Sequence, residues 1–334
     1  MMAMRVGLII PEDTPPTGGN AVSAHRVEQG LRAVGVDAEV VLYSPRLPAY
    51  DVYHAWNAVR VGARLLEDGV HPDQIVATWT GTDLWQDWVT RATALKPVLD
   101  PIRYQVVFTE DARNRLLADA PDWADHVIVI SPSVDIHRFI PEGRVAACHH
   151  PLAVLAGGVR PVKRSAWGVL LMEQLREETG QDWRLAILGP VRETGEWHRV
   201  TELAKTRPWV RLLGEVSQME MPEWYRAADI FLNTSSVEGV SNALMEAMAT
   251  GSLAVVSDIQ GNRALVEHQK TGLLFSDAAG FVDAVRWADA HPHEVQRIRH
   301  EARKFIVGRH SLSHEVARYM HLYQDCLAVR RCRC

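Results

Sequence analysis

Short apolar runs alternate with longer helix-like segments from one end of this chain to the other. The runs are apolar at nearly every position, which is typical of strands buried on both faces of a parallel sheet. The strands expected in the first half are 5–10, 38–42, 51–54, 74–78, 105–108 and 126–130. A second cycle begins at 152–156 and continues with strands at 183–188, 210–213 and 230–233. The alternation predicts an α/β chain in which crossover helices cover parallel sheets.

The length indicates two domains. The chain has 334 residues, more than one typical domain and enough for two of about 150 to 180. A polar, proline-bounded stretch at 141–151 shows no periodicity and is the expected linker. We therefore expect domains at 1–145 and 146–312, followed by a last helical segment at 313–334.

Composition excludes several classes of partner. The chain has 36 Lys and Arg against 41 Asp and Glu, a net charge of −5, which does not favour binding to nucleic acid or to an anionic membrane. No run approaches the length of about 18 apolar residues that would indicate a membrane span, and no signal-peptide pattern opens the chain. We expect a cytoplasmic protein.

The cysteines do not form a recognisable framework. There are 4 in the chain, with no Cys-x-x-Cys pair, so neither disulfides nor a bound metal are expected. Cys148, Cys332 and Cys334 are expected at a surface or between domains, with no assigned role.

Two acidic residues in the second half carry the strongest chemical signal. Glu238 follows the expected strand 230–233 across a polar turn, and Glu246 lies two turns into an expected helix at 242–249. At 3.6 residues per turn, the two side chains share one face to within roughly 80°. Two carboxylates on one face are suited to binding hydroxyl groups.

Backbone donors lie between these carboxylates. Gly239 allows a ligand to approach the chain closely, and the N–H groups of Val240, Ser241 and Asn242 form a helix start that attracts an anion. Hydroxyl-binding carboxylates beside phosphate-binding amides are what a sugar nucleotide requires. The plainer alternative is an ordinary helix whose glutamates lie in solvent.

This stretch resembles the donor-binding signature of retaining glycosyltransferases of family 4, which have the GT-B fold. The likeness continues through residues 251–257, 262–267 and 271–275. It implies two Rossmann-like domains facing each other across a cleft, with the final helix at 313–334 packed back on the N-terminal domain. It also implies transfer of a sugar from a nucleoside-diphosphate donor with retention of configuration.

A second element follows the first strand of the second domain. Gly158, Arg160 and Lys163 resemble the family's pair of cations that hold the donor diphosphate. Such cations offset the charge that develops on the leaving diphosphate. Because the chain has no Asp-x-Asp, we expect no metal and assign the cationic role to these side chains. Two solvated surface charges are the alternative.

The resemblance also implies individual roles. Arg160, Lys163 and Glu238 form the expected catalytic set, with Glu238 on the transferred sugar and the β-phosphate. Glu246 would accept hydrogen bonds from ribose hydroxyls. Gly214 and Val216 belong to the loop that contacts the base through backbone groups, and uridine is the default nucleoside.

A glycine pair opens the first helix of the N-terminal domain. Gly18 and Gly19 follow the first strand, where the family's glycine-rich loop faces the phosphates and the acceptor, and Asn20 is placed toward the acceptor. Two glycines at a helix start can form an anion-binding nest. The alternative is a flexible turn capped by Asn20.

The element at 78–83 departs from the family pattern. Thr80 stands where the family has a histidine, and Asp83 closes the element. His54, at the end of the preceding strand, could compensate and contact the acceptor, although packing is the commoner role of a single histidine. For the nearby tryptophans, stacking on a ligand and plain packing are equally open; they are Trp56, Trp79, Trp85 and Trp88.

Both halves lack Gly-x-Gly-x-x-Gly, which argues against a nicotinamide or flavin cofactor. A narrower likeness, at 17–22, 81–84, 159–163 and 259–262, is to selenosugar synthases and to the glycosyltransferase-1-domain-containing proteins. It implies a small soluble acceptor and a UDP-sugar donor. A non-catalytic nucleotide-sugar-binding protein and a nucleotide-sugar epimerase remain alternatives, and the sequence leaves open whether the chain forms a homodimer.

Overall fold

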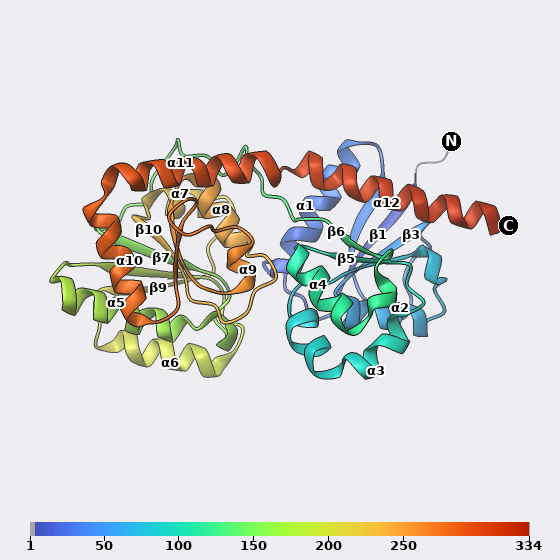
Figure 1. The fold of residues 1–334 in the computed structure, drawn as a ribbon, viewed down its shortest axis with the longest axis horizontal. Helices are drawn as coiled ribbons and strands as arrows, with labels where there is room; N and C mark the ends of the chain where they lie inside the picture. The colour runs from blue at the N-terminus through green and yellow to red at the C-terminus, as the bar shows by residue number, and fades with distance from the viewer. Residues whose placement is uncertain (1–3, 334) are drawn as a thin grey trace. The chain divides into compact units, whose positions relative to one another are not determined.

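The computed structural model of this protein describes residues 4–333, with side chains up to residue 328 (Figure 1). Cys334 and the side chain of Cys332, whose roles the sequence left open, lie outside the described residues. Contacts divide the chain into two units, one from the N-terminus to Ser133 together with the residues from His310 onward, the other from Val134 to Arg309. Each unit is built on one parallel six-stranded sheet.

The sheet of the first unit has the strand order β2-β1-β3-β4-β5-β6. Its strands are β1 Arg5–Ile10, β2 Asp37–Leu42, β3 Val52–Trp56, β4 Ile75–Thr78, β5 Tyr104–Val107 and β6 Val127–Val129. Its α-helices are α1 Gly19–Ala33, α2 Ala63–Glu67, α3 Val89–Leu99, α4 Glu110–Asp119 and α12 Leu312–Arg333. Two π-helical segments, Ala58–Gly62 and Asp83–Trp88, follow β3 and β4. Helix α12 contacts α1 and β3 of this unit.

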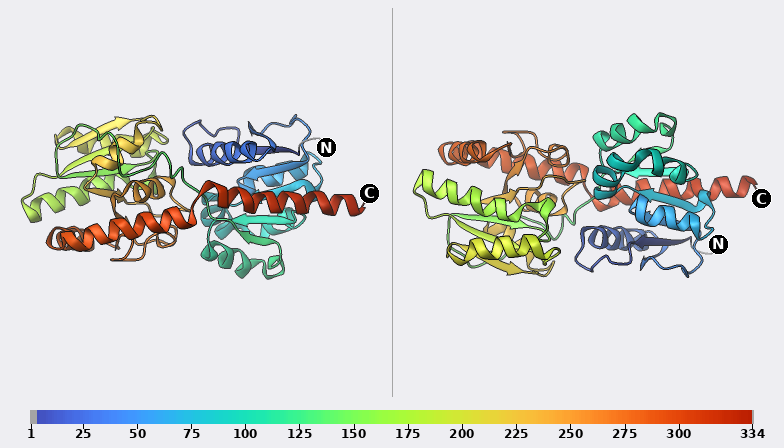
Figure 2. Two further views of the ribbon diagram at one scale, coloured as in Figure 1. Left: turned by 90° about the horizontal axis from the view of Figure 1, so that it is seen from above. Right: turned by 90° about the horizontal axis from the view of Figure 1, so that it is seen from below.

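The sheet of the second unit has the strand order β12-β11-β10-β7-β8-β9. Its strands are β7 Leu152–Ala156, β8 Arg184–Leu188, β9 Val210–Gly214, β10 Ile230–Asn233, β11 Leu253–Ser257 and β12 Leu273–Phe275. Its helices are α5 Ser165–Thr179, α6 Thr194–Lys205, α7 Met221–Ala227, α8 Asn242–Thr250, α9 Gln260–Arg263, α10 Ala278–Ala290 and α11 Pro292–Arg309. Figure 2 shows helices on both faces of each sheet.

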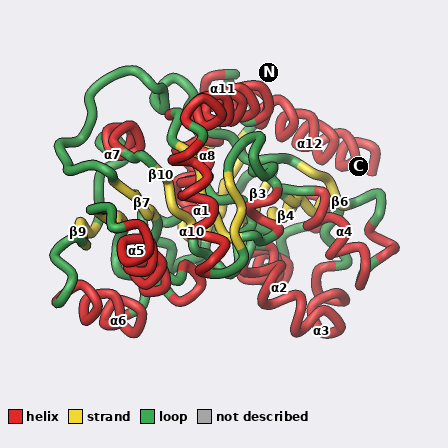
Figure 3. The backbone as a smooth tube through the Cα atoms, turned by 60° about the vertical axis from the view of Figure 1, so that its left-hand side comes forward, coloured by secondary structure: helices red, strands yellow, loops and turns green. Residues whose placement is uncertain are grey.

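The two-sided burial explains the apolar strands. In β7, Ala153 and Leu155 belong to one apolar cluster with α5 and α10, whereas Leu152 and Val154 belong to another with α7 and α8. Alternate side chains of one strand therefore enter opposite layers. Most positions of such a strand are then apolar, as the sequence pattern shows. The strands lie between the helical layers in Figure 3.

The division between the units comes earlier than the boundary expected at 145/146. The Phe139 side chain is buried in the core of the second unit, and Arg226 of α7 donates hydrogen bonds to the carbonyl oxygens of Ile140 and Arg144. The Ala146 N–H donates to the carbonyl of Glu223. Residues 134–151 are therefore attached to the second unit by backbone donors and acceptors, which a composition-based boundary does not reveal.

The expected α/β class is confirmed: two all-parallel sheets flanked by helices. Each expected strand occurs within two residues of its predicted limits, and the expected helix at 242–249 is α8. The sequence patterns did not single out the π-helical segments or α9. Within the described part of the chain, no helix combines the length and the apolar character needed to cross a membrane.

Candidate functional site

The candidate site lies along the carboxyl edge of the second sheet. Strands β10, β7, β8 and β9 are neighbours in that order and run parallel, so the loops that follow them leave at the same edge. The loop after β10 contains Glu238, and the loop after β7 contains Arg160 and Lys163. This edge of an open α/β sheet is where ligands generally bind.

Lys163 and Glu238 form a close ion pair. The Lys163 Nζ lies 2.5 Å from Oε1 of Glu238, and the two side chains are only 15% and 9% exposed. The Ser235 hydroxyl donates a second hydrogen bond to the same oxygen at 2.6 Å. Burial opposes ionisation of Glu238, but Lys163, Ser235 and the charge of Arg160 outweigh it and lower the pKa of the carboxyl. Glu238 is therefore a carboxylate at neutral pH.

A buried polar network of Asn233, Ser257 and Asn262 contacts the Glu238 loop. The Nδ2 group of Asn262 donates to Oδ1 of Asn233, to the carbonyl of Ser257 and to its hydroxyl. Asn233 in turn accepts from the N–H of Ser235 and approaches Glu238 with its own Nδ2, at 3.5 Å from Oε1. The network connects three neighbouring segments and fixes the loop geometry.

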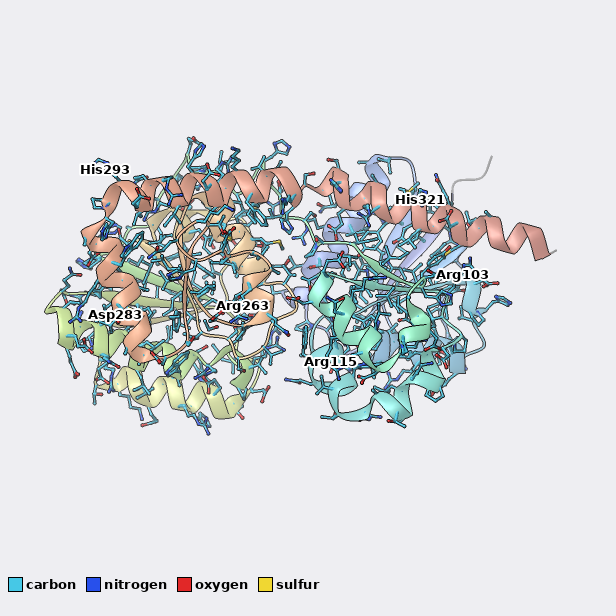
Figure 4. All side chains as sticks on the ribbon, viewed as in Figure 1. Arg103, Arg115, Arg263, Asp283, His293 and His321 are labelled. Atoms are coloured by element: carbon cyan, nitrogen blue, oxygen red, sulfur yellow. The ribbon has the colours of Figure 1, made fainter. Side chains whose placement is uncertain are left out.

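Helix α9 packs directly on this loop. A Cβ atom at Gly261 would lie 2.4 Å from the carbonyl oxygen of Glu238, so only glycine allows this approach. Arg263, labelled in Figure 4, ends α9 and pairs with Asp258 through two hydrogen bonds of 2.5 and 2.8 Å. The sequence assigned no role to Gly261 or Asn262; both fall in the narrow likeness at 259–262, and Asn262 also begins the likeness at 262–267.

Glu246 lies about one turn into α8 and is 4% exposed. The hydroxyl of Tyr225 donates to its Oε2 at 2.9 Å, and the Tyr225 ring is wholly buried against Phe139 and Phe231. Burial and the Glu246 charge raise the pKa of Tyr225 well above its usual value, so the phenol remains a donor. Tyr225 therefore orients the carboxylate, a contact that the sequence analysis did not anticipate.

The residues between the two glutamates form the turn into α8. Gly239, Val240 and Asn242 are partly exposed, whereas Ser241 is buried and accepts a hydrogen bond from the N–H of Leu244 at 3.4 Å. Ser241 is thus the N-cap of α8. The expected helix start is present, between Glu238 and Glu246.

Glycines bring the loops after β7, β8 and β9 together. A Cβ atom at Gly189 would lie 2.0 Å from the carbonyl oxygen of Gly157, and the Gly189 N–H donates to the carbonyl of Gly214 at 2.6 Å. Gly158, Gly214 and Val216 are partly exposed. The expected diphosphate loop and the expected base loop therefore flank the loop after β8.

In the first unit, the glycine pair is placed at the start of α1. Gly18 is the N-cap, with no side-chain cap, while Gly19 and Asn20 are the first two residues of the helix. Gly19 is exposed, and Gly18 and Asn20 are partly exposed. Asn20 is therefore not the N-cap that the alternative interpretation assumed.

Asp83 is a structural carboxylate. Its side chain is wholly buried and accepts backbone N–H bonds from Ala58, Thr80, Gly81 and Leu84 at 2.8 to 3.1 Å. Because these donors occupy the carboxylate, a contact to an acceptor substrate is not supported. Thr80 contributes its backbone to this arrangement, and the residue is partly exposed.

His54 lies in the core of the first unit. The residue is wholly buried, its Nδ1 lies 2.6 Å from the Tyr323 hydroxyl of α12, and its Nε2 lies 2.6 Å from the hydroxyl of Thr78. Both ring nitrogens are occupied, so His54 fits the packing interpretation and not an acceptor role. Burial lowers the pKa of His54 to about 3.

This pKa predicts acid sensitivity. Between pH ~6.5, where histidine ordinarily titrates, and the folded pKa of about 3, only the unfolded chain binds the proton. Stability conferred by neutral His54 is therefore complete above pH ~6.5 and falls by about 2 kcal/mol on going from pH 7 to pH 5. Hydrogen exchange of β3 and β4 amides measures this for the first unit alone.

The comparison uses two histidine variants. His54→Gln should remove most of this pH dependence, whatever its cost at pH 7. His321→Gln should retain it, since His321 is 81% exposed on α12 (Figure 4). An unchanged pH dependence in His54→Gln would contradict the assignment.

Three of the four tryptophans are core residues. Trp56, Trp79 and Trp88 are 0%, 2% and 0% exposed, and Trp79 donates to Gln105 at 2.9 Å. Trp85 is partly buried against the same core. Packing accounts for the three, and a stacking role is not supported for them.

Cys148 is partly buried, with its Sγ 3.7 Å from Nε2 of His150. Among the residues that the structure describes, no three His, Cys, Asp or Glu side chains are grouped to hold a metal ion.

Comparison with known proteins matches the part of the chain that contains the candidate site. Residues 150–291 match the family model described as "Glycosyl transferases group 1". This range contains Arg160, Lys163, Glu238 and Glu246. This part of the chain is therefore similar to group 1 glycosyltransferase domains. The chain is also 26% identical over 327 residues to "Glycosyltransferase 1 domain-containing protein 1" of Xenopus tropicalis, covering 91% of this chain and 93% of that relative.

A second relative matches in part. The D-inositol 3-phosphate glycosyltransferase of Pseudarthrobacter chlorophenolicus is 28% identical over 176 residues, which is 50% of this chain and 41% of that protein. The chain thus spans less than half of this relative. The match to the group 1 family model and the relatives named glycosyltransferases indicate that the protein is an enzyme with transferase activity.

Solved structures show the fold. The sucrose-phosphate synthase of Thermosynechococcus elongatus superposes with a TM-score of 0.80 at 17% identity, over 98% of this chain and 100% of that one. The Anabaena protein HepE, solved in complex with UDP-glucose, superposes with a TM-score of 0.72 at 14% identity, over 95% and 99%. The chain therefore has the GT-B fold, with two parallel sheets flanked by helices.

Proposed function

We propose that this enzyme transfers a sugar from a nucleoside-diphosphate donor, UDP-linked, to a small soluble acceptor with retention of configuration, as in glycosyltransferase family 4. The observation that supports it best is the Lys163–Glu238 pair, 2.5 Å apart, at the carboxyl edge of β7 and β10. Arg160 and the buried Glu246 lie on loops and helices that leave the same edge. In the proposed site, Arg160 and Lys163 bind the diphosphate, and Glu238 and Glu246 bind hydroxyl groups of the donor.

The chemistry follows from the charges. The acceptor oxygen attacks the anomeric carbon, the bond from that carbon to the β-phosphate oxygen breaks, and its electron pair remains on the leaving diphosphate. Arg160 and Lys163 offset this negative charge, and the diphosphate takes the acceptor proton. No metal is required for these steps, because side-chain cations take the electrostatic role.

In the proposed function, donor binding separates the Lys163–Glu238 ion pair. In this structure the partner of the Lys163 ammonium is a carboxylate. A bound diphosphate would compete for that ammonium, leaving Glu238 to accept hydrogen bonds from the hydroxyls of the transferred sugar. Donor binding would in this way replace the Lys163–Glu238 ion pair by two ligand contacts: Lys163 with the diphosphate and Glu238 with the sugar hydroxyls.

Glu246 provides the test of the donor site. Glu246→Gln keeps the shape of the side chain but replaces a charged acceptor of ribose hydroxyls by a neutral one. We expect UDP to bind about 10-fold to 100-fold more weakly, since a hydrogen bond to a charged group is worth about 1.5–3 kcal/mol. Calorimetry with UDP, GDP and ADP, in EDTA without added metal, measures it.

The matched control is Glu202→Gln, a glutamate that is 68% exposed on α6, which should bind UDP as the wild type does. Release of UDP together with a glycosylated acceptor, in the presence of EDTA, would support metal-free transfer. Wild-type affinity in Glu246→Gln would contradict the donor-site assignment, and strict dependence on added divalent metal would contradict the metal-free mechanism.

A further inference from the structure

Arg192 occupies the loop between the two halves of the expected donor site. It follows β8, and β8 lies between β7, which leads to Arg160 and Lys163, and β9, which leads to Glu215. The Arg192 N–H donates to the carbonyl of Val159 at 3.0 Å, and Val159 also pairs with Val191 in an isolated parallel bridge. The backbone of Arg192 is therefore fastened to the expected diphosphate loop.

The side chain of Arg192 lies against that loop as well. A Cβ atom at Gly158 would be 2.6 Å from Cγ and 3.2 Å from Nε of Arg192. Glycine at position 158 thus leaves room for the arginine stem, which is only partly exposed. Gly158 was expected to contact the donor itself; its closest constraint in the structure is Arg192.

One negative and one positive side chain act on the Arg192 guanidinium, Glu215 and Arg160. Burial lowers the pKa of its guanidinium, the Glu215 carboxylate counters this effect, and the positive charge of Arg160 adds to it. Two guanidinium groups close enough to repel each other are stabilised when an anion binds between them. Their side chains leave adjacent strands at the edge where a diphosphate is expected.

The order of loops along the edge indicates which phosphate Arg192 would bind. Following the sheet, Glu238 comes after β10, Arg160 and Lys163 after β7, Arg192 after β8, and Gly214 at the end of β9. In the proposed function the sugar lies at Glu238 and the base at the loop of Gly214. The phosphate nearest the nucleoside then falls beside Arg192.

We propose that Arg192 is an additional donor-binding residue, which holds the nucleoside-proximal phosphate while Arg160 and Lys163 hold the distal one. This inference rests on the proposed function. The only sequence signal for Arg192 is its position, two residues beyond the Gly-Pro that follows β8.

The test separates the two phosphates. Affinities of uridine, UMP and UDP are measured by calorimetry and by competition for the wild type, Arg192→Gln and Arg160→Gln. Arg192→Gln should weaken UMP and UDP each by about 10-fold or more and leave uridine unchanged. Arg160→Gln should weaken UDP, whose distal phosphate it binds, but have little effect on UMP. Arg192→Lys should recover part of the loss, because a point charge replaces the planar donor.

Arg199→Gln is the matched control, since Arg199 follows in α6 and is 76% exposed; its affinities should equal those of the wild type. Melting temperatures of all variants check that they are folded. Unchanged UMP affinity in Arg192→Gln, or a wild type that binds UMP no better than uridine, would overturn this inference. Failure of the wild type to bind UDP, GDP or ADP would instead contradict the proposed function.

Discussion

Lys163→Met is expected to lower the free energy of unfolding of the second unit by about 3 kcal/mol. The variant removes the cation 2.5 Å from a carboxylate that is 9% exposed, and removal of one partner from a buried pair costs about 3–5 kcal/mol. The lower end applies because the pair retains some contact with solvent. Urea unfolding of the wild type and the variant measures the loss. In the proposed mechanism turnover should fall by about 100-fold or more.

The double variant Lys163→Met/Glu238→Gln separates the two effects. Removing the isolated charge should recover most of the stability but none of the turnover. Lys205→Met is the surface control, because its pair with Glu202 is 67% and 68% exposed and should contribute less than about 1 kcal/mol. Wild-type stability in Lys163→Met would contradict a stabilising role of the buried Lys163–Glu238 pair.

Asp83→Ala should destabilise the first unit by about 4 kcal/mol or more. The carboxylate accepts hydrogen bonds from four backbone N–H groups, at Ala58, Thr80, Gly81 and Leu84, and each buried donor left unsatisfied costs about 1–3 kcal/mol. Burial raises the pKa of Asp83 to about 6, while these donors oppose the rise. Hydrogen exchange of β3 and β4 measures the stability of this unit.

The same variant decides between two roles for Asp83. A structural carboxylate predicts loss of stability, with donor affinity in the second unit unchanged. Asp13→Ala, at a residue that is 66% exposed and paired with Arg60, should cost less than about 1 kcal/mol. A fully stable Asp83→Ala enzyme that lost acceptor affinity would restore the acceptor role expected from sequence.

Much of the candidate donor site could be predicted from local sequence pattern. Glu238 and Glu246 were placed by a strand, a turn and a helix that follow one another within twenty residues, and β10 and α8 form as expected. Arg160 and Lys163 were placed in the same way after β7. Because the carboxyl ends of parallel strands share one edge, such local assignments also predict that the side chains converge.

The first unit shows where local pattern was insufficient. His54 and Asp83 have the residue types of ligand-binding groups at the ends of strands, yet both are wholly buried. The Tyr323 hydroxyl beside His54 comes from a distant part of the chain, whereas three of the four backbone donors to Asp83 lie within three residues of it. Residue type and spacing do not reveal that these partners already satisfy the side chains.

The sequence by itself determined the α/β class, the strands, the helix start at Ser241 and the four charged residues expected to bind the donor, because apolar periodicity and turn residues act over a few positions. Only the tertiary structure decided that Tyr225 orients Glu246, that Gly261 and Asn262 support the Glu238 loop, and that Arg192 lies against Gly158. These contacts join segments far apart in the chain, and their geometry depends on strand order and on how closely the loops pack.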